Sequence, residues 1–362
     1  MAEKLRVLEV SGSFHQMGVQ HAQKYGDAIH EFTEDRIHLS TGELWTGRNL
    51  SREAILELAD ACVAEHEAYS PELMDELRGM SEVTGLSLGK LIINNGFTDF
   101  IDVVYGAGEA YEAKIPQQVA DDCTAFLVSN DSAAGGQGFY GQTWDMHATA
   151  TPHVILLHGK PDNAPDFLAF TITGCVGMIG MNEHGIAIGI NNLLGSDGQV
   201  GVTWNFVVRK VLMQDNIEDA LACITDAKLA GAHNFMLMDK HGKGYNVEAM
   251  STRKEVTPLE EGSLVHTNHC LVDTTREVER ERHEQSLESS RKRLDLAYEH
   301  LNTVPVTVDA LMEMTRADHI CVKSTPPFHS ETAGAAIMQP ATGDFWAAWG
   351  RPAENEYERF KI

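Results

Sequence analysis

Apolar positions recur at two different periods along the chain, and the change falls at Cys123. Before this residue they recur about every 3.6 positions, which is typical of helices packed on one face. From Cys123 onward the period falls to about two, as in strands with alternating faces. The pattern predicts a mostly helical segment over residues 1–122 and a sheet-rich segment over residues 123–362, which together form one domain.

Residues that favour helix ends support the first segment. Ser51 is a suitable N-cap, and Pro71 stands at an early helical position where its missing N–H does no harm. The predicted helices cover residues 16–37, 55–66, 73–80 and 88–97.

Turn clusters separate short strand-like runs in the second segment, and the helices do not alternate regularly with them. The predicted strands cover residues 123–128, 138–144, 153–158, 167–173, 186–191, 234–238, 244–249, 264–267, 335–339 and 345–349. The predicted helices cover residues 204–213, 217–227, 276–300 and 308–314. This order predicts an α+β fold in which helices cover two antiparallel sheets.

Charge excludes several functions. The chain has 28 Lys and Arg against 53 Asp and Glu, a formal charge of −25. Such a surface repels nucleic-acid phosphates and anionic membranes, so neither is expected as a partner. No apolar run approaches the roughly 20 residues of a membrane span, and none follows Lys4 and Arg6 as in a secretory signal. We therefore expect a cytoplasmic protein.

The six cysteines are far apart in the sequence and none forms a C-x-x-C pair. This spacing is not that of a disulfide framework or a zinc ribbon. Free thiols in a reducing compartment are the simpler interpretation.

Two glycine-containing motifs imitate catalytic or cofactor-binding sequences. Gly85–Gly89 matches the G-x-S-x-G nucleophile elbow, but the elbow requires a strand before the serine and a helix is predicted there. Ser87 is better interpreted as a helix cap. The spaced glycines of residues 174–180 precede no helix, so they do not form a dinucleotide site. No cofactor is expected.

Seventeen histidines suggest a metal site, but the sequence contains no H-E-x-x-H motif. The densest cluster is His266, His269 and Cys270. A metal-dependent hydrolase that uses His266, His269 and Asp145 is retained as an alternative, although structural and surface imidazoles are the commoner reason for many histidines. No bound metal is expected.

Cys123 differs from the other cysteines by its position at the start of the sheet-rich segment. Asp121 and Asp122 precede it, and Asp145 ends the next predicted strand. Asn268 follows a later strand, and an asparagine in such a place is a common oxyanion donor. These residues are candidates for nucleophilic catalysis.

With these residues the sequence resembles the isopenicillin-N acyltransferase family, also called acyl-coenzyme A:6-aminopenicillanic acid acyltransferases. This family belongs to the N-terminal nucleophile (Ntn) hydrolases. The resemblance covers nearly the whole chain. Its most specific parts are Cys123-Thr124, Gly141-Gln142-x-Trp144-Asp145, His266-Thr267-Asn268-His269-Cys270 and Gly350-Arg351-Pro352, and its weaker parts are Gly18-Val19-Gln20-His21 and Glu76-Leu77-Arg78-Gly79-Met80.

The resemblance implies a four-layer αββα sandwich and a precursor that cuts its own chain between Asp122 and Cys123. Cys123 would then act as the nucleophile through a thioester, with Asp145 orienting the new amine and Asn268 stabilising the oxyanion. The implied substrate is a small N-acyl amide, and an amine or a thioester is a further implied partner. A homodimer and a monomer both fit a protein of this size.

The sequence departs from the fungal members of the family at three places, one of which is Met250, which replaces a serine that follows the Glu of a strand. Asp122 stands where they carry glycine, and Thr332-Ala333-Gly334 stands where they carry Ser-Arg-Gly at the substrate pocket. Penicillin chemistry is therefore not inferred. An uncleaved Ntn-like scaffold without catalytic activity remains the second alternative.

Overall fold

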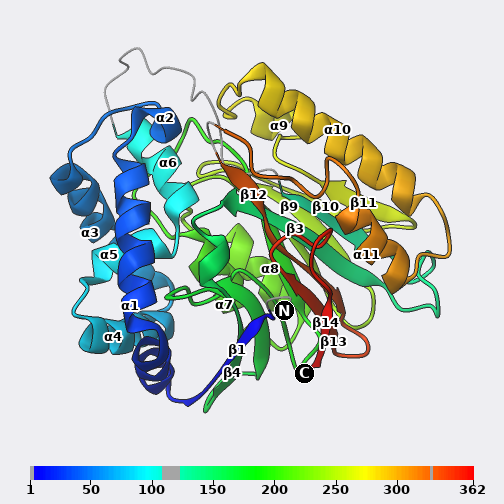
Figure 1. Ribbon diagram of the computed structural model, residues 1–362, viewed down its shortest axis with the longest axis horizontal. Helices are drawn as coiled ribbons and strands as arrows, with labels where there is room; N and C mark the ends of the chain where they lie inside the picture. Colours follow the sequence, from blue (N-terminus) through cyan, green and yellow to red (C-terminus); the bar gives the residue numbers. More distant parts are fainter. Residues whose placement is uncertain (1–3, 108–122, 327–328) are drawn as a thin grey trace.

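Two sheets lie face to face between layers of helices (Figure 1). The computed structural model describes residues 4–107, 123–326 and 329–362. One sheet has eight strands and the other six, and strands β2 and β3 of the smaller sheet pack against β7 and β8 of the larger one. The predicted layered α+β architecture is therefore confirmed.

The eight-stranded sheet has the order β1-β4-β5-β6-β7-β8-β9-β10. Its strands are β1 (Arg6–Gly12), β4 (Val154–Pro161), β5 (Phe167–Ile172), β6 (Ile179–Asn182), β7 (Ala187–Asn192), β8 (His233–Met238), β9 (Gly244–Ala249) and β10 (Lys254–Pro258). One pairing departs from the expected antiparallel arrangement, because β1 pairs with β4 in parallel. Strand β1 also lies in the segment predicted as mostly helical. Its only sequence signal is the short alternation in which Leu8 and Val10 are buried.

The six-stranded sheet is antiparallel throughout its described pairings and has the order β11-β2-β3-β12-β13-β14. Its strands are β2 (Thr124–Val128), β3 (Phe139–His147), β11 (Ser263–His266), β12 (Ser330–Gln339), β13 (Asp344–Trp349) and β14 (Glu358–Lys361). Strand β2 begins directly after Cys123, so this residue stands at the edge of the inter-sheet space.

Helices cover both outer faces of the sheets. They are α1 (Phe14–Ser40), α2 (Glu43–Thr46), α3 (Arg52–Tyr69), α4 (Pro71–Thr84), α5 (Leu88–Asn94), α6 (Phe97–Gly106), α7 (Trp204–Val211), α8 (Ile217–Thr225), α9 (Asp273–Arg276), α10 (Glu284–Leu301) and α11 (Val308–Arg316). Helices α7 and α8 pack on the larger sheet, and α10 and α11 pack on the smaller one. Helices α1 to α6 gather on the side opposite α10 (Figure 1).

Helix caps confirm two of the sequence interpretations. Ser51 accepts a hydrogen bond from the Ala54 N–H, 3.2 Å away, and so caps α3. Ser87 accepts from the Lys90 N–H at 3.4 Å and caps α5. The G-x-S-x-G match is therefore a helix start, because the side chain of Ser87 is used to satisfy an N-terminal N–H group.

Helices α1 and α4 cross through two glycines of the weaker family motifs. A Cβ on Gly18 would lie 1.9 Å from the carbonyl oxygen of Glu76, and a Cβ on Gly79 would lie 2.2 Å from that of His15. Only glycine permits so close a backbone approach. These motif positions are explained by packing.

The predicted helix over residues 276–300 is wrong in its first part. Helix α9 ends at Arg276 and α10 begins at Glu284, and the residues between them are not helical. Their polar groups bind the body of the protein instead: the Arg280 N–H donates to the Leu194 carbonyl, and the Glu279 carboxylate accepts from the Cys270 N–H. These long-range bonds outweigh the helical preference of the charged residues.

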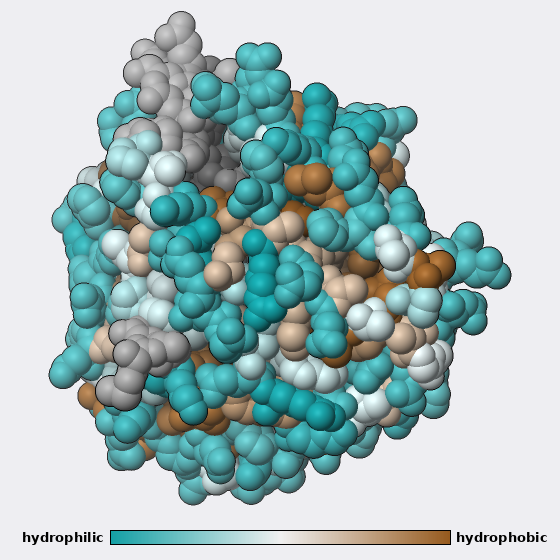
Figure 2. Space-filling view, turned by 45° about the vertical axis from the view of Figure 1, so that its right-hand side comes forward, coloured by the Kyte–Doolittle hydropathy of each residue, from teal (hydrophilic) through white to brown (hydrophobic). Residues whose placement is uncertain are grey.

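The view turned 45° from Figure 1 shows a mainly hydrophilic face, with apolar residues in patches between polar ones (Figure 2). This matches the formal charge of −25. None of the described helices is both long and apolar enough to cross a membrane.

Candidate active site

The thiol of Cys123 faces the inter-sheet space beside strand β3. Cys123 is 1% exposed, and its Sγ lies 3.4 Å from the Asp145 N–H nitrogen and 3.9 Å from the Asp145 carbonyl oxygen. Thr124 pairs with Thr143, so Trp144 stands beside Cys123 in the ladder. Cys123, Trp144 and Met146 belong to one buried cluster. The two backbone contacts bring Cys123 and Asp145 together.

The carbonyl group of Cys123 is held by two side chains. Arg293 Nη1 donates to it at 2.7 Å, and Asn191 Nδ2 donates to it at 3.2 Å. Arg293 comes from α10 and is fully buried, whereas Asn191 comes from β7 of the other sheet. Donors from two layers therefore fix the backbone at the residue that carries the thiol.

Asn268 reaches Cys123 through Arg293. Its Oδ1 accepts from Arg293 Nη2 at 3.1 Å, and its Nδ2 donates to the Asn192 carbonyl at 3.1 Å. The Asn268 N–H in turn donates to Ser290 Oγ at 2.9 Å. The side-chain amide of Asn268 therefore orients the Arg293 guanidinium. The Nδ2 group of this amide is directed at the Asn192 backbone carbonyl and not at the Cys123 thiol.

Arg293 and Asn191 were absent from the sequence predictions. The buried residues of α10 are Ser290, Arg293, Ala297 and Leu301, and the first two of them are polar. A search for apolar residues at helical spacing cannot find this face, because two of its buried residues are polar. The buried positions nevertheless follow one another at spacings of three and four residues. For Asn191 the signal was its place at the end of an apolar strand, the same signal that selected Asn268.

Asp145 is fully buried, and its pair partner across the ladder is Thr332 of β12. Its carboxylate acts on the nearby Cys321. Burial is the main reason that the pKa of the Cys321 thiol is raised, and Asp145 raises it further. The Asp145 side chain thus lies close enough to Cys321 to act on its thiol, while the Asp145 backbone contacts Cys123 Sγ. Asp122, the predicted cleavage partner, lies outside the described residues.

The remaining cysteines are buried free thiols whose acidity is suppressed. Burial raises the pKa of Cys62 and Cys223 to about 11 and that of Cys175 to about 12, and it also raises the pKa of Cys270 and Cys321. Because the thiolate is the nucleophilic form, these five are poor nucleophiles near neutral pH.

The histidines of the metal alternative are engaged in hydrogen bonds. His266 Nε2 lies 2.9 Å from Glu248 Oε1, and its Nδ1 lies 2.8 Å from the Thr267 carbonyl. His269 Nδ1 lies 2.7 Å from Ser290 Oγ, and burial lowers the pKa of His269 to about 4. Within the part of the chain that the structure describes, no three His, Cys, Asp or Glu residues are grouped to hold a metal ion.

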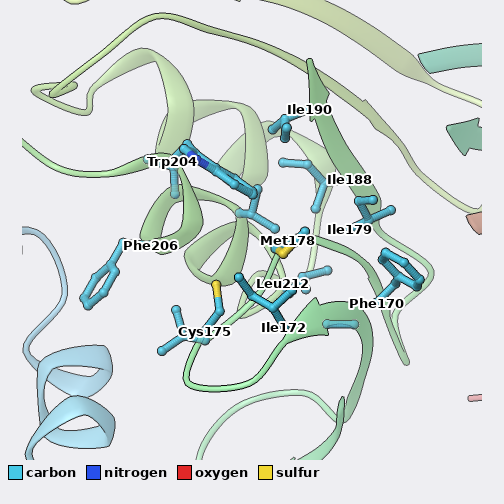
Figure 3. Close-up of a cluster of buried hydrophobic side chains, with 14 of the residues drawn as sticks. Phe170, Ile172, Cys175, Met178, Ile179, Ile188, Ile190, Trp204, Phe206 and Leu212 are labelled. Atoms are coloured by element: carbon cyan, nitrogen blue, oxygen red, sulfur yellow. The ribbon is translucent and has the colours of Figure 1, made fainter. Parts of the chain in front are cut away.

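A small cavity lies beside β3 and is lined by Trp144 and Met146, the two neighbours of Asp145. Its volume is about 20 Å³, which is room for about one water molecule. Six of its apolar lining residues come from β3, β5, the loop after β5, α6 and α7, and three of them appear in Figure 3; they are Phe97, Trp144, Met146, Ile172, Met178 and Trp204.

One charged residue lines this cavity. Arg36 is 1% exposed, and its guanidinium carbon lies 4.4 Å from the Phe32 ring centre and 5.0 Å from that of Phe97. Arg36 pairs with Asp35 and lies 3.2 Å from His147 Nδ1. Burial, together with the Arg36 charge, holds the pKa of His147 well below its usual value, so His147 is neutral.

These features define an α+β sandwich with a buried cysteine at a strand start. The family model for acyl-coenzyme A:6-aminopenicillanic acid acyl-transferase matches residues 132–354, more than half of the chain. The protein belongs to this family. The match includes Asp145 and Asn268 and begins after Cys123.

One curated relative is the 40 kDa form of acyl-coenzyme A:6-aminopenicillanic-acid-acyltransferase of Emericella nidulans. The two are 25% identical over 206 residues, which are 56% of this chain and 53% of the relative. The matched part thus spans about half the length of that relative.

Two similar solved structures are a mutant of the conjugated bile acid hydrolase from Clostridium perfringens and the penicillin V acylase from Agrobacterium tumefaciens. The first has a TM-score of 0.46 and 10% identity, covering 67% of this chain and 92% of that one. The second has a TM-score of 0.42 and 11% identity, covering 66% and 86%. Likeness at this level says nothing about the activity of this chain.

Proposed function

We propose that this protein is a self-processing cysteine amidohydrolase or acyltransferase that acts on a small N-acyl amide. The observation that carries the proposal is the pair of donors on the Cys123 carbonyl, Arg293 at 2.7 Å and Asn191 at 3.2 Å. They immobilise the backbone of a residue whose thiol lies in the inter-sheet space beside β3. Membership of the acyltransferase family supports the same reaction class.

The first step is cleavage of the chain before Cys123. The Cys123 thiol attacks the carbonyl carbon of Asp122, the amide bond breaks, and an ester-type intermediate forms that water resolves. The products are a carboxylate on Asp122 and a free α-amine on Cys123. Residues 1–122 and 123–362 then become two chains of one domain.

The new α-amine supplies the base for turnover. Its reference pKa of about 7.7–8.0 allows it to take the thiol proton near neutral pH. The Cys123 sulfur attacks the acyl carbon of the substrate, and the C–N bond breaks as the amine product takes that proton. Water then attacks the thioester, releasing a carboxylic acid and restoring the thiol; an amine or thiol acceptor in place of water gives acyl transfer.

The surrounding residues stabilise charge and position. Negative charge on the tetrahedral oxygen needs fixed donors, and one such donor is typically worth about 10²–10³ in rate. We assign this role to the Asn268 amide, whose Oδ1 also orients Arg293 at 3.1 Å. Asp145 orients the α-amine. Hydrolysis is preferred over transfer because water is always present.

The described cysteines are free thiols, which suits a reducing compartment such as the cytoplasm. The proposed reaction requires no metal or organic cofactor, since the thiol and the α-amine supply the nucleophile and the base.

The mass of the purified protein tests the proposal. Cleavage before Cys123 gives fragments of about 13.4 and about 26.4 kDa when the 39.8 kDa of the whole chain is divided by length. We expect both fragments in the wild type and one intact chain in Cys123→Ala. The matched control is Cys223→Ala, which removes a buried thiol from α8 and should process normally.

Hydrolysis of N-acyl amides is then measured on the same proteins. Amidase activity in wild type and Cys223→Ala, with none in Cys123→Ala, is the expected result. An intact chain without activity in all three proteins would instead support the uncleaved scaffold. Cleavage or hydrolysis that persists in Cys123→Ala would overturn the proposal.

A further inference from the structure

Gln142 of β3 bridges the two sheets beside the candidate active site. Its side chain is fully buried, and its Oε1 accepts a hydrogen bond from the Ile190 N–H of β7 at 2.8 Å. Strands β3 and β7 belong to different sheets, so this bond crosses the space between them. Gln142 is part of the Gly141-Gln142-x-Trp144-Asp145 motif, and no step of the proposed reaction uses its side chain.

The Ile190 N–H lies where β7 has lost a neighbouring strand. Strand β6 pairs with β7 only at Ala187 and Ile188, so Ile190 lies beyond the end of that pairing. A buried N–H group needs an acceptor, because leaving it unpaired costs free energy. The Gln142 side chain supplies this acceptor from the other sheet and thereby ties β7 to β3.

The Tyr140 hydroxyl orients the Gln142 amide. Tyr140 is fully buried, lies two residues earlier on β3 and donates to the same Oε1. The other end of the amide, Nε2, donates to the Thr143 carbonyl at 3.3 Å. Burial raises the pKa of Tyr140 well above its usual value, and the charge of Cys123 raises it further. The hydroxyl therefore keeps its proton and stays a donor.

Gly189 of β7 leaves the space in which these groups meet. A Cβ on Gly189 would lie 2.0 Å from the Tyr140 hydroxyl oxygen and 2.1 Å from Gln142 Oε1. Both distances are far shorter than a van der Waals contact, so any other residue here would push the two groups away from β7. The absence of a side chain at this position is what allows the bond between the sheets to form.

The next residue of β7 connects this bond to the candidate nucleophile. Asn191 Nδ2 donates to the Cys123 carbonyl at 3.2 Å, and Asn191 Oδ1 accepts from Asn234 Nδ2 at 3.4 Å. Because Ile190 and Asn191 are adjacent, a shift of β7 at Ile190 would move the Asn191 amide relative to that carbonyl. A misplacement of about 1 Å at a reacting group can cost about 10²-fold in rate.

We propose that Gln142 is a positioning residue which, with Tyr140 and Gly189, fixes β7 against β3 and so places the Asn191 donor on the Cys123 carbonyl. The inference rests on the proposed function for the reaction that Cys123 performs. It goes further because it assigns Gln142 a role that acts through Asn191 and through no contact of its own with the thiol.

Gln142→Met tests the role, because it keeps the length of the side chain and removes the acceptor. We expect self-cleavage and the kcat of amide hydrolysis to fall about tenfold with KM unchanged, since positioning and not substrate binding is lost. The matched control is Gln214→Met, which removes a glutamine that donates to the Lys210 carbonyl at 2.9 Å and should leave both rates unchanged. Tyr140→Phe removes one of the two donors and should give a smaller loss in the same direction.

A double-mutant cycle with Asn191→Ala separates positioning from a general loss of stability. If Gln142 acts through Asn191, then Gln142→Met should lower the rates about tenfold in the wild type and hardly at all in Asn191→Ala. A merely structural role would lower the rates by the same factor in both backgrounds. Equal losses in folded forms of the two proteins would therefore overturn the proposal.

Hydrogen exchange tests the placement without any substrate. Peptides that contain Ile190 should exchange about tenfold faster in Gln142→Met and in Gly189→Ala than in the wild type or in Gln214→Met. Unchanged protection would overturn the inference whether or not the protein is an amidase. Lost protection with full activity would overturn the positioning role and retain the reaction. A wild type without amidase activity, with protection lost only in the variants, would overturn the proposed reaction and retain Gln142 as the residue that places Asn191.

Discussion

Two buried polar clusters of the protein differ in what their groups face. Around Glu248, the carboxylate accepts from His266, from the Leu271 N–H at 2.6 Å and from Thr275. Around Cys123, the buried Arg293 and Asn191 donate to a backbone carbonyl beside the thiol. In the first cluster, several donors bind one buried carboxylate. In the second cluster, both donors bind the backbone carbonyl of Cys123.

The difference distinguishes buried polar groups that stabilise the fold from buried polar groups that position a reacting atom. A carboxylate with donors on several sides is a stabilising centre, because its charge is neutralised where it stands. Donors that fix the backbone next to a nucleophile position a reacting atom instead. The sequence places the His266 and Asn268 signals two residues apart, and only the contacts show that they serve different clusters.

The largest effect is expected at the Glu248 cluster. Glu248→Ala leaves buried donors without their acceptor, and such losses cost about 3–5 kcal/mol. Urea unfolding at neutral pH measures this change. The fraction that remains folded should keep its amidase activity, since Glu248 does not contact Cys123 or its two donors. A loss of activity without loss of stability would break the distinction between the clusters.

The stability contribution of Glu248 has a definite pH dependence. Burial raises the pKa of Glu248, but hydrogen bonds and the charge of His266 outweigh it, so the folded-state pKa lies below the usual value. A lowered carboxyl pKa contributes stability above the unfolded-state value and loses it as pH falls through the folded-state value. The difference between wild type and Glu248→Ala should therefore shrink in acid below about pH 4.5.

Arg293→Met should lower processing and amidase activity about 10²–10³-fold, because a fixed charged donor next to the reacting residue is lost. Arg291 lies on the same helix and is exposed, so Arg291→Met is the matched control. Processing is followed by mass and activity by amide hydrolysis. Equal losses in the two variants would show that the Cys123 carbonyl contact has no special role.

His21 provides a third environment, a buried histidine that accepts the Gly174 N–H at 2.9 Å. Burial lowers its pKa to about 4, so it stays neutral in the folded protein while the unfolded chain takes up a proton. Stability should fall by about 2–3 kcal/mol as pH drops from 6.5 to 4.

His21→Gln keeps an acceptor without the titration and should flatten this part of the stability curve. His38→Gln changes an exposed histidine of the same helix and should not. Denaturant unfolding at several pH values compares them. A wild-type curve as flat as that of His21→Gln would contradict the assignment.

The smallest effect is expected from metal removal. Dialysis against a chelator should leave hydrolysis and stability unchanged, because the ring nitrogens of His266 are already used by Glu248 and Thr267. Loss of activity that zinc restores would favour the metal-dependent alternative and would assign His266 a catalytic role.

Local sequence patterns predicted much of the fold and part of the candidate site. Serine caps placed the starts of α3 and α5, and alternation placed β2 and β3 around Cys123 and Asp145. Each depends on residues close in the sequence. Strand β1 was missed because its partner β4 lies far along the chain.

The rest depends on contacts that no local pattern encodes. Arg293 is one arginine in a highly charged helix until the fold brings it 2.7 Å from the Cys123 carbonyl, 170 residues away. The break before α10 arises from bonds to Leu194 and Cys270. The small cavity beside β3 joins residues of both segments, such as Phe97 and Trp204, so no single motif contains it.

Strand β1 gives the proposed cleavage an unusual outcome. It precedes Cys123 in the chain yet runs in parallel register with β4 from Arg6 to Gly12. A cut before Cys123 would thus produce two polypeptides that are already paired as strands of one sheet. They would form a heterodimer at the moment of cleavage, with no separate association step. Dissociation would require breaking the pairing of β1 with β4 at the sheet edge. Cleavage of the peptide bond would therefore leave the rest of the fold nearly unchanged.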